Sequence, residues 1–231
     1  MAGRTFSLTI FFPCYNDRET ISTLIENAGK VASEWTSDYE ILVIDDGSTD
    51  GSRKLLETLQ PKNRHLRLVF HERNLGYGAA LQTGFKESNK DLIFYTDGDG
   101  QYDVLELSML LPRMIDGVDL VNGYKIKRED PWYRHILGEL YIFLAKILFR
   151  ITVRDVNCDF RLMRRRIFKT VKLESKSGAI GVELIRKVER AGFKIAECPV
   201  HHYRRSSGCS QFLKLGKILQ TILDLIRLRL Q

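Results

Sequence analysis

The chain has 231 residues, a length that fits one domain of generous size. Hydrophobic residues make up 44% and charged residues 28%, which is typical of a folded globular protein and argues against a disordered chain. The net charge of +7 suits a nucleic acid, an anionic membrane or a phosphorylated substrate as partner, and charge alone does not choose among them.

The cysteine pattern and the longest apolar runs bear on location. No two of the four cysteines (Cys14, Cys158, Cys198 and Cys209) form a Cys-x-x-Cys pair, so we expect free thiols in a reducing compartment rather than a zinc site. The first nine residues lack the apolar segment of a signal peptide. No run of about 18 apolar residues is present, so we do not expect the chain itself to span a bilayer.

Strands and helices are predicted to alternate through the first half. Short apolar strands are expected at residues 5–12, 39–44, 66–70, 91–96 and 118–122, the first of them ending at Pro13. Helical spacing is found at residues 17–34, 50–59, 77–88 and 103–115, with Asp50 as an N-cap and Pro112 as a kink. Continuously apolar strands indicate an α/β fold, in which a mostly parallel sheet is flanked by helices.

The second half is less regular. Helices are expected at residues 132–149 and 181–191 and a strand at residues 194–198, whereas residues 155–166 are polar and highly charged. Residues 212–230 predict a basic amphipathic helix. We therefore divide the chain into a catalytic domain at residues 1–210 and a C-terminal helix at residues 211–231. This helix is expected to lie in a membrane interface, or else to pack on the domain or in a dimer.

Three polar clusters follow predicted strands, at residues 13–17, 45–50 and 97–101. Ligands of parallel α/β sheets bind outside the carboxyl ends of the strands, so these clusters mark the expected site. Asp97 and Asp99 can both reach one hard divalent cation, and such a cation commonly adds substrate phosphates to one or two carboxylates. The alternative is an Asp-Gly turn without metal.

Two further segments bear on the ligand. Asp45 and Asp46 are expected to bind the base and ribose, or to cap the next helix through the turn at Gly47. The small residues around Gly76 and Gly78 let the backbone approach a ligand. Neither a P-loop nor a G-x-G-x-x-G after the first strand is present, which disfavours a dinucleotide cofactor.

These motifs resemble those of the family 2 glycosyltransferases, which have the GT-A fold, and the resemblance covers residues 5–210. The family's P-x-Y-N-E is matched by residues 13–17 with Asp17 in place of Glu, and its D-D-G-S-x-D by residues 45–50. Its N-x-G-x-x-x-A is matched by Asn74, Gly76 and Ala80. Its D-x-D is matched by Asp97 and Asp99, with Gln101 at a further characteristic position.

The second half resembles the polyprenyl-phosphate group of that family, which includes dolichyl-phosphate mannose synthase. Residues 155–161 are similar to its D-x-x-x-G-F-R, with Asp159 in place of the common Gly. Residues 197–200 resemble its E-x-P-V and residues 205–210 its R-x-x-G-x-S. The chain departs from the group at Lys125, where Arg is common, and at Gly138, where Ser is expected four residues beyond Arg134.

The resemblance implies an inverting, metal-dependent hexosyltransferase. The donor would be GDP-mannose or UDP-glucose and the acceptor dolichyl or undecaprenyl phosphate. Mg²⁺ or Mn²⁺, held by Asp97, Asp99 and Gln101, would offset the charge of the leaving nucleoside diphosphate. Because a phosphate oxygen is already anionic, positioning and charge stabilisation would supply the catalysis.

The site residues follow from the matched motifs. The residues expected to bind the donor nucleotide are Pro13, Tyr15, Asp17, Asp45, Asp46, Gly76, Asp97, Gly98 and Asp99. Those expected to bind the acceptor or its phosphate are Lys125, Arg134, Arg161, Arg205 and Ser210, since Arg matches phosphate geometry. Asp99, Asp155 and Arg161 are the expected catalytic residues. For each arginine, a surface charge or structural ion pair is the alternative.

The expected partners are a nucleotide sugar, a polyprenyl phosphate and a membrane surface, with a homo-oligomer or a membrane-embedded subunit as further partners. The expected location is the cytoplasmic face of a membrane. One alternative is a family 2 enzyme with a soluble sugar or polysaccharide acceptor. Another is a non-catalytic nucleotide-binding module. A nucleic acid is not expected, because an acidic strand edge repels its phosphates.

Overall fold

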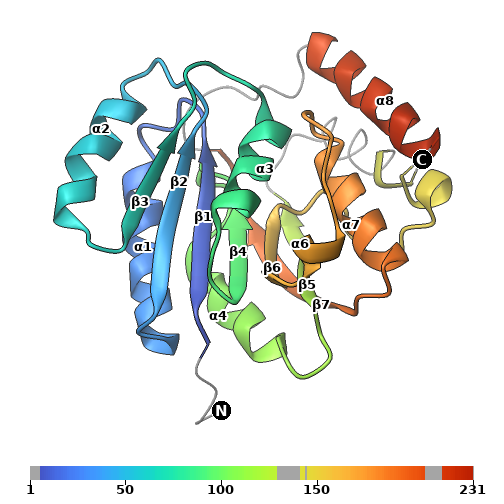
Figure 1. Cartoon of the computed structure of the whole chain (residues 1–231), viewed down its shortest axis with the longest axis horizontal. Coiled ribbons are helices and arrows are strands. Elements are labelled where there is room, and N and C mark those ends of the chain that lie inside the picture. The colour runs from blue at the N-terminus through green and yellow to red at the C-terminus, as the bar shows by residue number, and fades with distance from the viewer. Residues whose placement is uncertain (1–5, 129–140, 144, 206–214, 231) are drawn as a thin grey trace.

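A twisted seven-stranded sheet forms the centre of the computed structural model, which describes residues 6–128, 141–143, 145–205 and 215–230 (Figure 1). The strand order is β3-β2-β1-β4-β6-β5-β7. The strands are β1 (Leu8–Cys14), β2 (Tyr39–Asp45), β3 (Leu66–Phe70), β4 (Leu92–Thr96), β5 (Leu120–Arg128), β6 (Phe160–Arg164) and β7 (Ile195–His202). Only β6 runs antiparallel to its neighbours β4 and β5, so the mostly parallel α/β sheet is confirmed.

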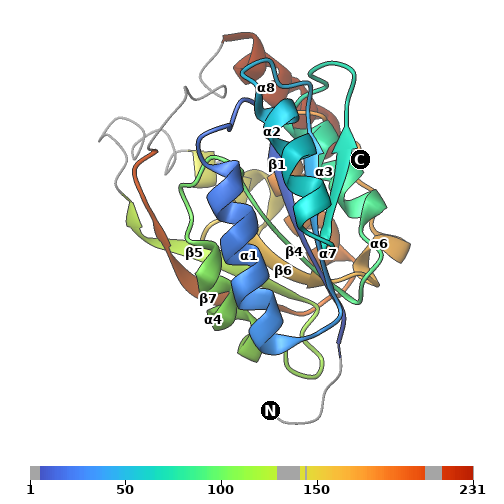
Figure 2. The same ribbon diagram turned by 90° about the vertical axis from the view of Figure 1, so that its left-hand side faces the viewer.

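Helices cover both faces of the sheet (Figures 1 and 2). The helices are α1 (Ile21–Trp35), α2 (Ser52–Leu59), α3 (Tyr77–Glu87), α4 (Leu107–Leu110), α6 (Ile167–Thr170), α7 (Ile180–Arg190) and α8 (Leu215–Leu230). Residues 141–143 and 145–149 are also helical, and the remainder of the helix predicted at residues 132–149 lies outside the described residues. Side chains of α1, α2 and α4 pack on one face, whereas those of α3, α6, α7 and residues 142–149 pack on the other.

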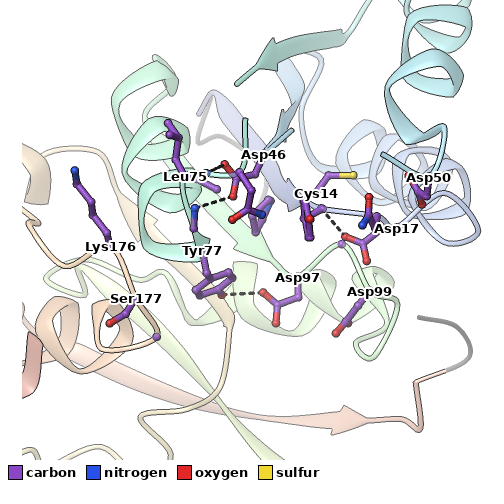
Figure 3. Close-up of a pocket in the computed structure, with 18 of the residues that line it drawn as sticks. Cys14, Asp17, Asp46, Asp50, Leu75, Tyr77, Asp97, Asp99, Lys176 and Ser177 are labelled. Atoms are coloured by element: carbon purple, nitrogen blue, oxygen red, sulfur yellow. Dashed lines mark hydrogen bonds between the residues drawn. The ribbon is translucent and has the colours of Figure 1, made fainter. Parts of the chain in front are cut away.

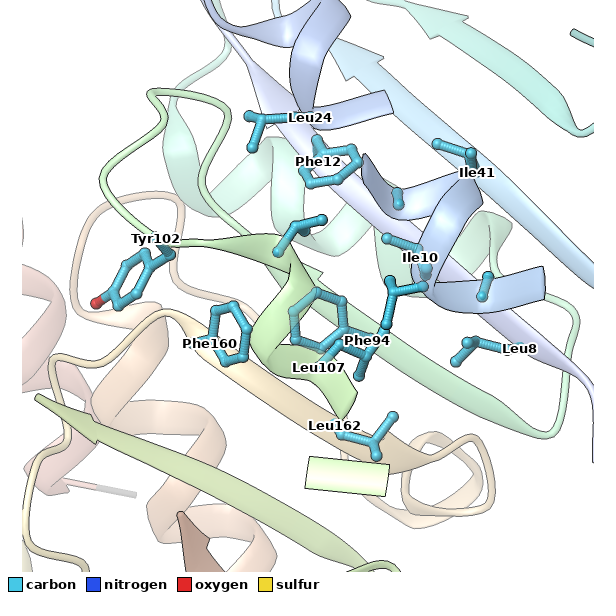
Figure 4. Close-up of a cluster of buried hydrophobic side chains, with 14 of the residues drawn as sticks. Leu8, Ile10, Phe12, Leu24, Ile41, Phe94, Tyr102, Leu107, Phe160 and Leu162 are labelled. Carbon is cyan, nitrogen blue, oxygen red and sulfur yellow. The ribbon is translucent and has the colours of Figure 1, made fainter. Parts of the chain in front are cut away.

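Strand β1 shows how the sheet divides the core in two. Leu8, Ile10 and Phe12 point into the cluster beneath α1 (Figure 4). Phe11 belongs to the cluster on the other face, beneath α3. All seven residues of β1 are buried because both faces of the strand are covered. This is why every residue of β1 except Thr9 is apolar, and the Thr9 hydroxyl donates to Oε1 of Glu40 at 2.7 Å.

The strands predicted at residues 118–122 and 194–198 extend further, as β5 and β7, and three other elements also differ from the prediction. Strand β1 continues through Pro13, because its pairing with β4 ends at Phe11 and the missing N–H of Pro13 breaks no ladder bond there. The helix predicted at residues 103–115 is instead three short helical turns, the last containing Pro112. Strand β6 lies in the charged stretch 155–166, where no strand was predicted.

The close packing of α3 on β1 depends on Gly84. A Cβ at Gly84 would lie 2.4 Å from a ring carbon of Phe11, whereas one at Gly29 in α1 would meet Ile41 at an ordinary 3.8 Å. We expect Gly84→Ala to lower the free energy of unfolding by about 1–3 kcal/mol through overpacking. Gly29→Ala should leave it unchanged or raise it by up to about 1 kcal/mol through helix propensity. Urea unfolding checks both, and equal effects would contradict this account.

Candidate functional site

A cavity of about 950 Å³ opens at the carboxyl ends of β1, β2 and β4. The three polar clusters predicted from the sequence meet there because these strands are parallel neighbours. The lining also includes residues 74–77, Ala80, residues 176–178, Arg205 and two residues of α8. The structure therefore brings together segments from both halves of the chain around one acidic cavity (Figure 3).

Asp97 lies at the floor of the cavity, directly after β4. Its Oδ1 accepts a hydrogen bond from the Tyr77 hydroxyl at 2.8 Å. Burial, with the nearby carboxylates of Asp159 and Asp99, raises the pKa of Asp97 well above its ordinary value. An acid in this setting favours a bound cation, because a cation offsets the repulsion and the lost hydration of the ionised form.

Asp99 lies two residues after Asp97 in the same loop. Its Oδ1 accepts from the backbone N–H of Gln101 at 3.0 Å, and its Oδ2 accepts from Nη2 of Arg205. Gly98 is required between the two acids, since a Cβ there would lie 2.8 Å from the Pro13 carbonyl oxygen. The loop thus fixes Asp97 and Asp99 beside β1.

Asp17 supplies a third carboxyl group to the cavity. Its Oδ2 accepts from the Tyr15 N–H at 3.0 Å. Burial raises the pKa of Asp17 to about 7, the Asp99 carboxylate adds to this, and the Tyr15 bond and Arg205 partly offset it. Pro13 and Tyr15, which were expected to bind the nucleotide, also line the cavity.

Asp46 and Asp45 have different roles. Asp46 lines the cavity, where Oδ2 accepts from the Gly76 N–H at 2.9 Å and Oδ1 accepts from the Leu75 N–H at the same distance. Asp45 is fully buried, does not line the cavity and binds Arg53 at 2.8 Å. The Asp45 carboxylate thus holds α2 against the sheet, and its contact with the nucleotide stays a prediction.

Lys125 and Asp155 lie away from the cavity lining. Nζ of Lys125 lies 3.2 Å from Oδ2 of Asp155 and donates to the Asn157 carbonyl at 2.6 Å. Burial alone would raise the pKa of Asp155, but the charge of Lys125 and its hydrogen bonds outweigh burial and lower it. The two residues form a buried ion pair, and the phosphate and sugar contacts expected of them stay predictions.

Arg161 is likewise placed differently from the expectation. Its guanidinium is fully buried and donates to Asn122 Oδ1 at 2.7 Å, to the Val156 carbonyl at 2.6 Å and to the Tyr95 hydroxyl. Arg161 therefore ties β6 to its neighbours β4 and β5, and it does not line the cavity. The structural ion-pair alternative applies here, with Asp159 at 3.5 Å.

The remaining predicted residues divide into three groups. Gly76, Gly98 and Arg205 line the cavity, and their contacts with the ligands stay predictions. Gln101 does not line it, since its Nε2 donates to the Tyr203 carbonyl at 3.0 Å and ties the acidic loop to the end of β7. Arg134 and Ser210 lie outside the described residues.

Several cavity residues were not singled out from the sequence. They include Arg18, Glu19, Tyr77, Lys176, Ser177, Gly178, Gln220 and Thr221. Tyr77 follows the glycine of a motif that was noticed, but its bond to Asp97 depends on how α3 meets β4. Lys176 and Gln220 reach the cavity only through the tertiary fold, so no local sequence signal could have indicated them.

The cavity offers only a small number of protein ligands to a metal ion. Within the described ranges, no group of three or more His, Cys, Asp and Glu side chains has the geometry of a metal site. The chain therefore offers the two carboxylates of Asp97 and Asp99, and phosphates and water must supply the other ligands of a hard cation.

Comparison with known proteins agrees with this geometry. The model of glycosyl transferase family 2 matches residues 9–172, more than half of the sequence. The chain belongs to this family. Its enzymatic class, glycosyltransferase, follows from that membership.

Several solved structures share the fold of this glycosyltransferase chain. The complex of glucosyl-3-phosphoglycerate synthase from Mycobacterium tuberculosis with Mn²⁺, UDP and glucosyl-3-phosphoglycerate has a TM-score of 0.74 at 20% identity, covering 98% of this chain and 80% of that one. The complex of that synthase with Mn²⁺, UDP-glucose and phosphoglyceric acid has a TM-score of 0.72 at 19% identity, covering 99% and 80%. The complex with Mg²⁺ and UDP has 0.73 at 18%, covering 98% and 80%. At such identities the likeness shows the fold, and the expected GT-A fold is confirmed.

Two other expectations can be compared with the structure. Cys14, Cys158 and Cys198 are buried free thiols, as predicted, and Cys209 lies outside the described residues. No helix in the described part of the chain is long and apolar enough to cross a membrane.

The raised pKa of Asp17 predicts how stability depends on pH. Because the pKa is about 7 in the folded protein and ordinarily 3.8, the stability of metal-free protein falls as the pH rises through that window. Asp17→Asn removes the ionisation and keeps an oxygen for the Tyr15 N–H. We expect it to raise the free energy of unfolding near pH 8 and to change it little near pH 4, as measured by urea unfolding.

Asp50→Asn is the control, because it should change the free energy of unfolding near pH 8 in the opposite direction. Burial would raise the pKa of Asp50, but hydrogen bonds from Ser52 and from the Arg18 N–H outweigh it, so the folded protein favours the ionised form. Asp50→Asn should therefore lower stability near pH 8. Changes of the same sign in both variants would contradict the assignment.

Proposed function

We propose that this chain transfers a hexose from a nucleoside diphosphate sugar, with UDP as the nucleotide, and uses a divalent cation held by Asp97 and Asp99. The supporting observation is the placement of both acids in one cavity at the carboxyl edge of a parallel sheet. UDP is favoured over GDP because the similar structures contain UDP or UDP-glucose.

The residues present fit a divalent cation. Asp97 is buried among like charges, and Asp99 is paired with a guanidinium rather than left uncompensated. Bound between these acids and the diphosphate, Mn²⁺ or Mg²⁺ would offset the charge that develops on the leaving group. The similar structures contain one or the other metal together with UDP.

The chain's own groups prepare the donor site. Tyr77 holds the Asp97 carboxylate by its hydroxyl, and Asp46 holds the backbone of residues 75–76 at the cavity wall. Arg205 is the cationic side chain nearest the two acids within the described residues, and its pKa is raised by the Asp99, Asp17 and Asp97 carboxylates, which together outweigh burial. Released from Asp99, its guanidinium can bind the diphosphate.

For the acceptor we place a soluble, phosphorylated small molecule first. The similar structures contain phosphoglyceric acid or its glucosylated product. Of the five residues expected to bind a polyprenyl phosphate, Lys125 and Arg161 are buried against protein partners, and Arg134 and Ser210 are not described. Only Arg205 lines the cavity among those that are described.

Polyprenyl phosphate remains the second candidate because of α8. Five large apolar side chains of that helix are exposed, which is the surface expected of an enzyme that meets a lipid. The peripheral position at the cytoplasmic face of a membrane, and the division of the chain at residue 210, stay predictions that accompany this candidate.

The direct test is a transfer assay with radiolabelled UDP-glucose or GDP-mannose, and with phosphoglyceric acid or a short polyprenyl phosphate as acceptor. We expect transfer from UDP-glucose to phosphoglyceric acid with Mn²⁺ and none with EDTA. Asp99→Asn should reduce the rate by about 100-fold or more, as loss of a charge-stabilising group does. Asp38→Asn, which changes an exposed acid paired with Lys90, should have no effect.

The acceptor and donor arms separate the alternatives. Label entering only the lipid would reverse the order of the two acceptors, and transfer only from GDP-mannose would overturn the choice of UDP. Equal activity with EDTA, or in Asp99→Asn, would contradict the metal-dependent mechanism.

A further inference from the structure

Helix α8 carries an apolar stripe on the side where a helix of a globular protein is usually polar. The exposed large side chains are Leu219, Ile222, Leu223, Ile226 and Leu230. At about 100° per residue, these positions fall on one stripe of the helix. Such a stripe normally packs against the core, but here it faces solvent.

The opposite side of α8 borders the donor cavity. Gln220 and Thr221 line the cavity, and Asp224 and Leu228 are buried on the same side. Nε2 of Gln220 donates to Oδ1 of Asp224 at 3.0 Å, which fixes the amide beside the cavity. The helix is therefore a wall of the site as well as an exposed surface.

Arg186 of α7 anchors the C-terminal half of α8. Its guanidinium donates to the Leu228 carbonyl and lies 5.0 Å from the ring centre of Phe149. A second helical segment thus meets α8 at Arg186, and three of its large apolar side chains are exposed too: Phe143, Ile147 and Leu148. Figure 1 shows this segment beside the C-terminal end of α8.

The charges around the stripe indicate what covers it. Arg227 and Arg229 are exposed and flank the stripe on its two sides. Apolar side chains bordered by arginines suit an anionic lipid interface, where the rings and aliphatic chains enter the acyl boundary and the arginines meet headgroups. A second copy of this chain is disfavoured, because each copy carries a net charge of +7.

We propose that α8 docks on an anionic membrane surface through this stripe, and that docking holds the opposite side of the helix, with Gln220 and Thr221, against the donor cavity. Membrane binding and donor-nucleotide binding then strengthen each other by the same factor, since coupling between two sites is reciprocal. The coupling rests on the donor cavity of the proposed function and is independent of the acceptor class.

The first experiment measures docking alone, by co-sedimentation with vesicles of phosphatidylglycerol and phosphatidylcholine in equal parts or of phosphatidylcholine only. Ile226→Glu is compared with Ile115→Glu, because the two isoleucines are 52% and 53% exposed but Ile115 lies outside the stripe. We expect wild type and Ile115→Glu to bind the anionic vesicles, and Ile226→Glu to bind about 10-fold more weakly or worse. Binding should also weaken as salt is added.

The second experiment measures coupling, by titrating UDP with Mn²⁺ in the presence and absence of the same vesicles. Anionic vesicles should raise the UDP affinity of wild type and Ile115→Glu about 5-fold or more, and should not change that of Ile226→Glu. Without vesicles all three proteins should bind UDP equally.

Any other result of these two experiments overturns one specific part of the proposal. Failure of wild type to bind anionic vesicles removes the docking surface, and a dimer that Ile226→Glu dissociates assigns the stripe to a second copy. Vesicle binding without a change in UDP affinity removes the coupling. Absence of UDP binding under every condition removes the proposed function and leaves the docking result standing, because docking is scored without nucleotide.

Discussion

Repulsion among buried carboxyl groups is the constraint on which the site depends. Asp17, Asp97 and Asp99 line one cavity, and Asp159 lies close enough to raise the pKa of Asp97. Ionised acids that have lost hydration destabilise one another, so they either take up protons or gather positive charge. In the protein alone, the Arg205 guanidinium meets this requirement at Asp99 and the Tyr77 hydroxyl stabilises Asp97.

The neighbouring backbone is built around the same requirement. Gly98 allows the acidic loop to approach β1, and Gln101 ties that loop to the end of β7. On the other side, Asp46 accepts from two backbone N–H groups and from Nδ1 of His71 at 2.7 Å. These bonds hold the cavity walls before any ligand arrives, which is the preorganisation that electrostatic catalysis needs.

The sequence predicted the location of the site because location depends on local features. An apolar strand followed by Asp-Gly or Asp-Asp-Gly ends at the sheet edge, and the edges of β1, β2 and β4 coincide in a parallel sheet. The resemblance to family 2 predicted the fold for the same reason, since its motifs are the loops that end these strands.

The surroundings of individual residues in the second half depend on long-range packing, which the sequence does not show. Arg161 belongs to a motif expected at the acceptor, yet it is buried because Asn122 and Val156 supply hydrogen-bond partners from other segments. The same burial explains why β6 was not predicted. Its two arginines make the stretch look exposed in the sequence, although the strand is mostly buried. Asp45 and Asp46 are adjacent in sequence, but alternation along β2 sends one to Arg53 and the other to the cavity.

Metal-dependent nucleotide binding at the paired acids is the central claim, and calorimetric titration of UDP with Mn²⁺ or with EDTA tests it most directly. We predict that Mn²⁺ tightens UDP binding in wild type by about 10-fold or more, since a cation held by Asp97 and Asp99 would offset the negative charge of the diphosphate. In Asp97→Asn this dependence on Mn²⁺ should disappear. UDP binding of equal strength with Mn²⁺ and with EDTA, in wild type and variant alike, would contradict the account.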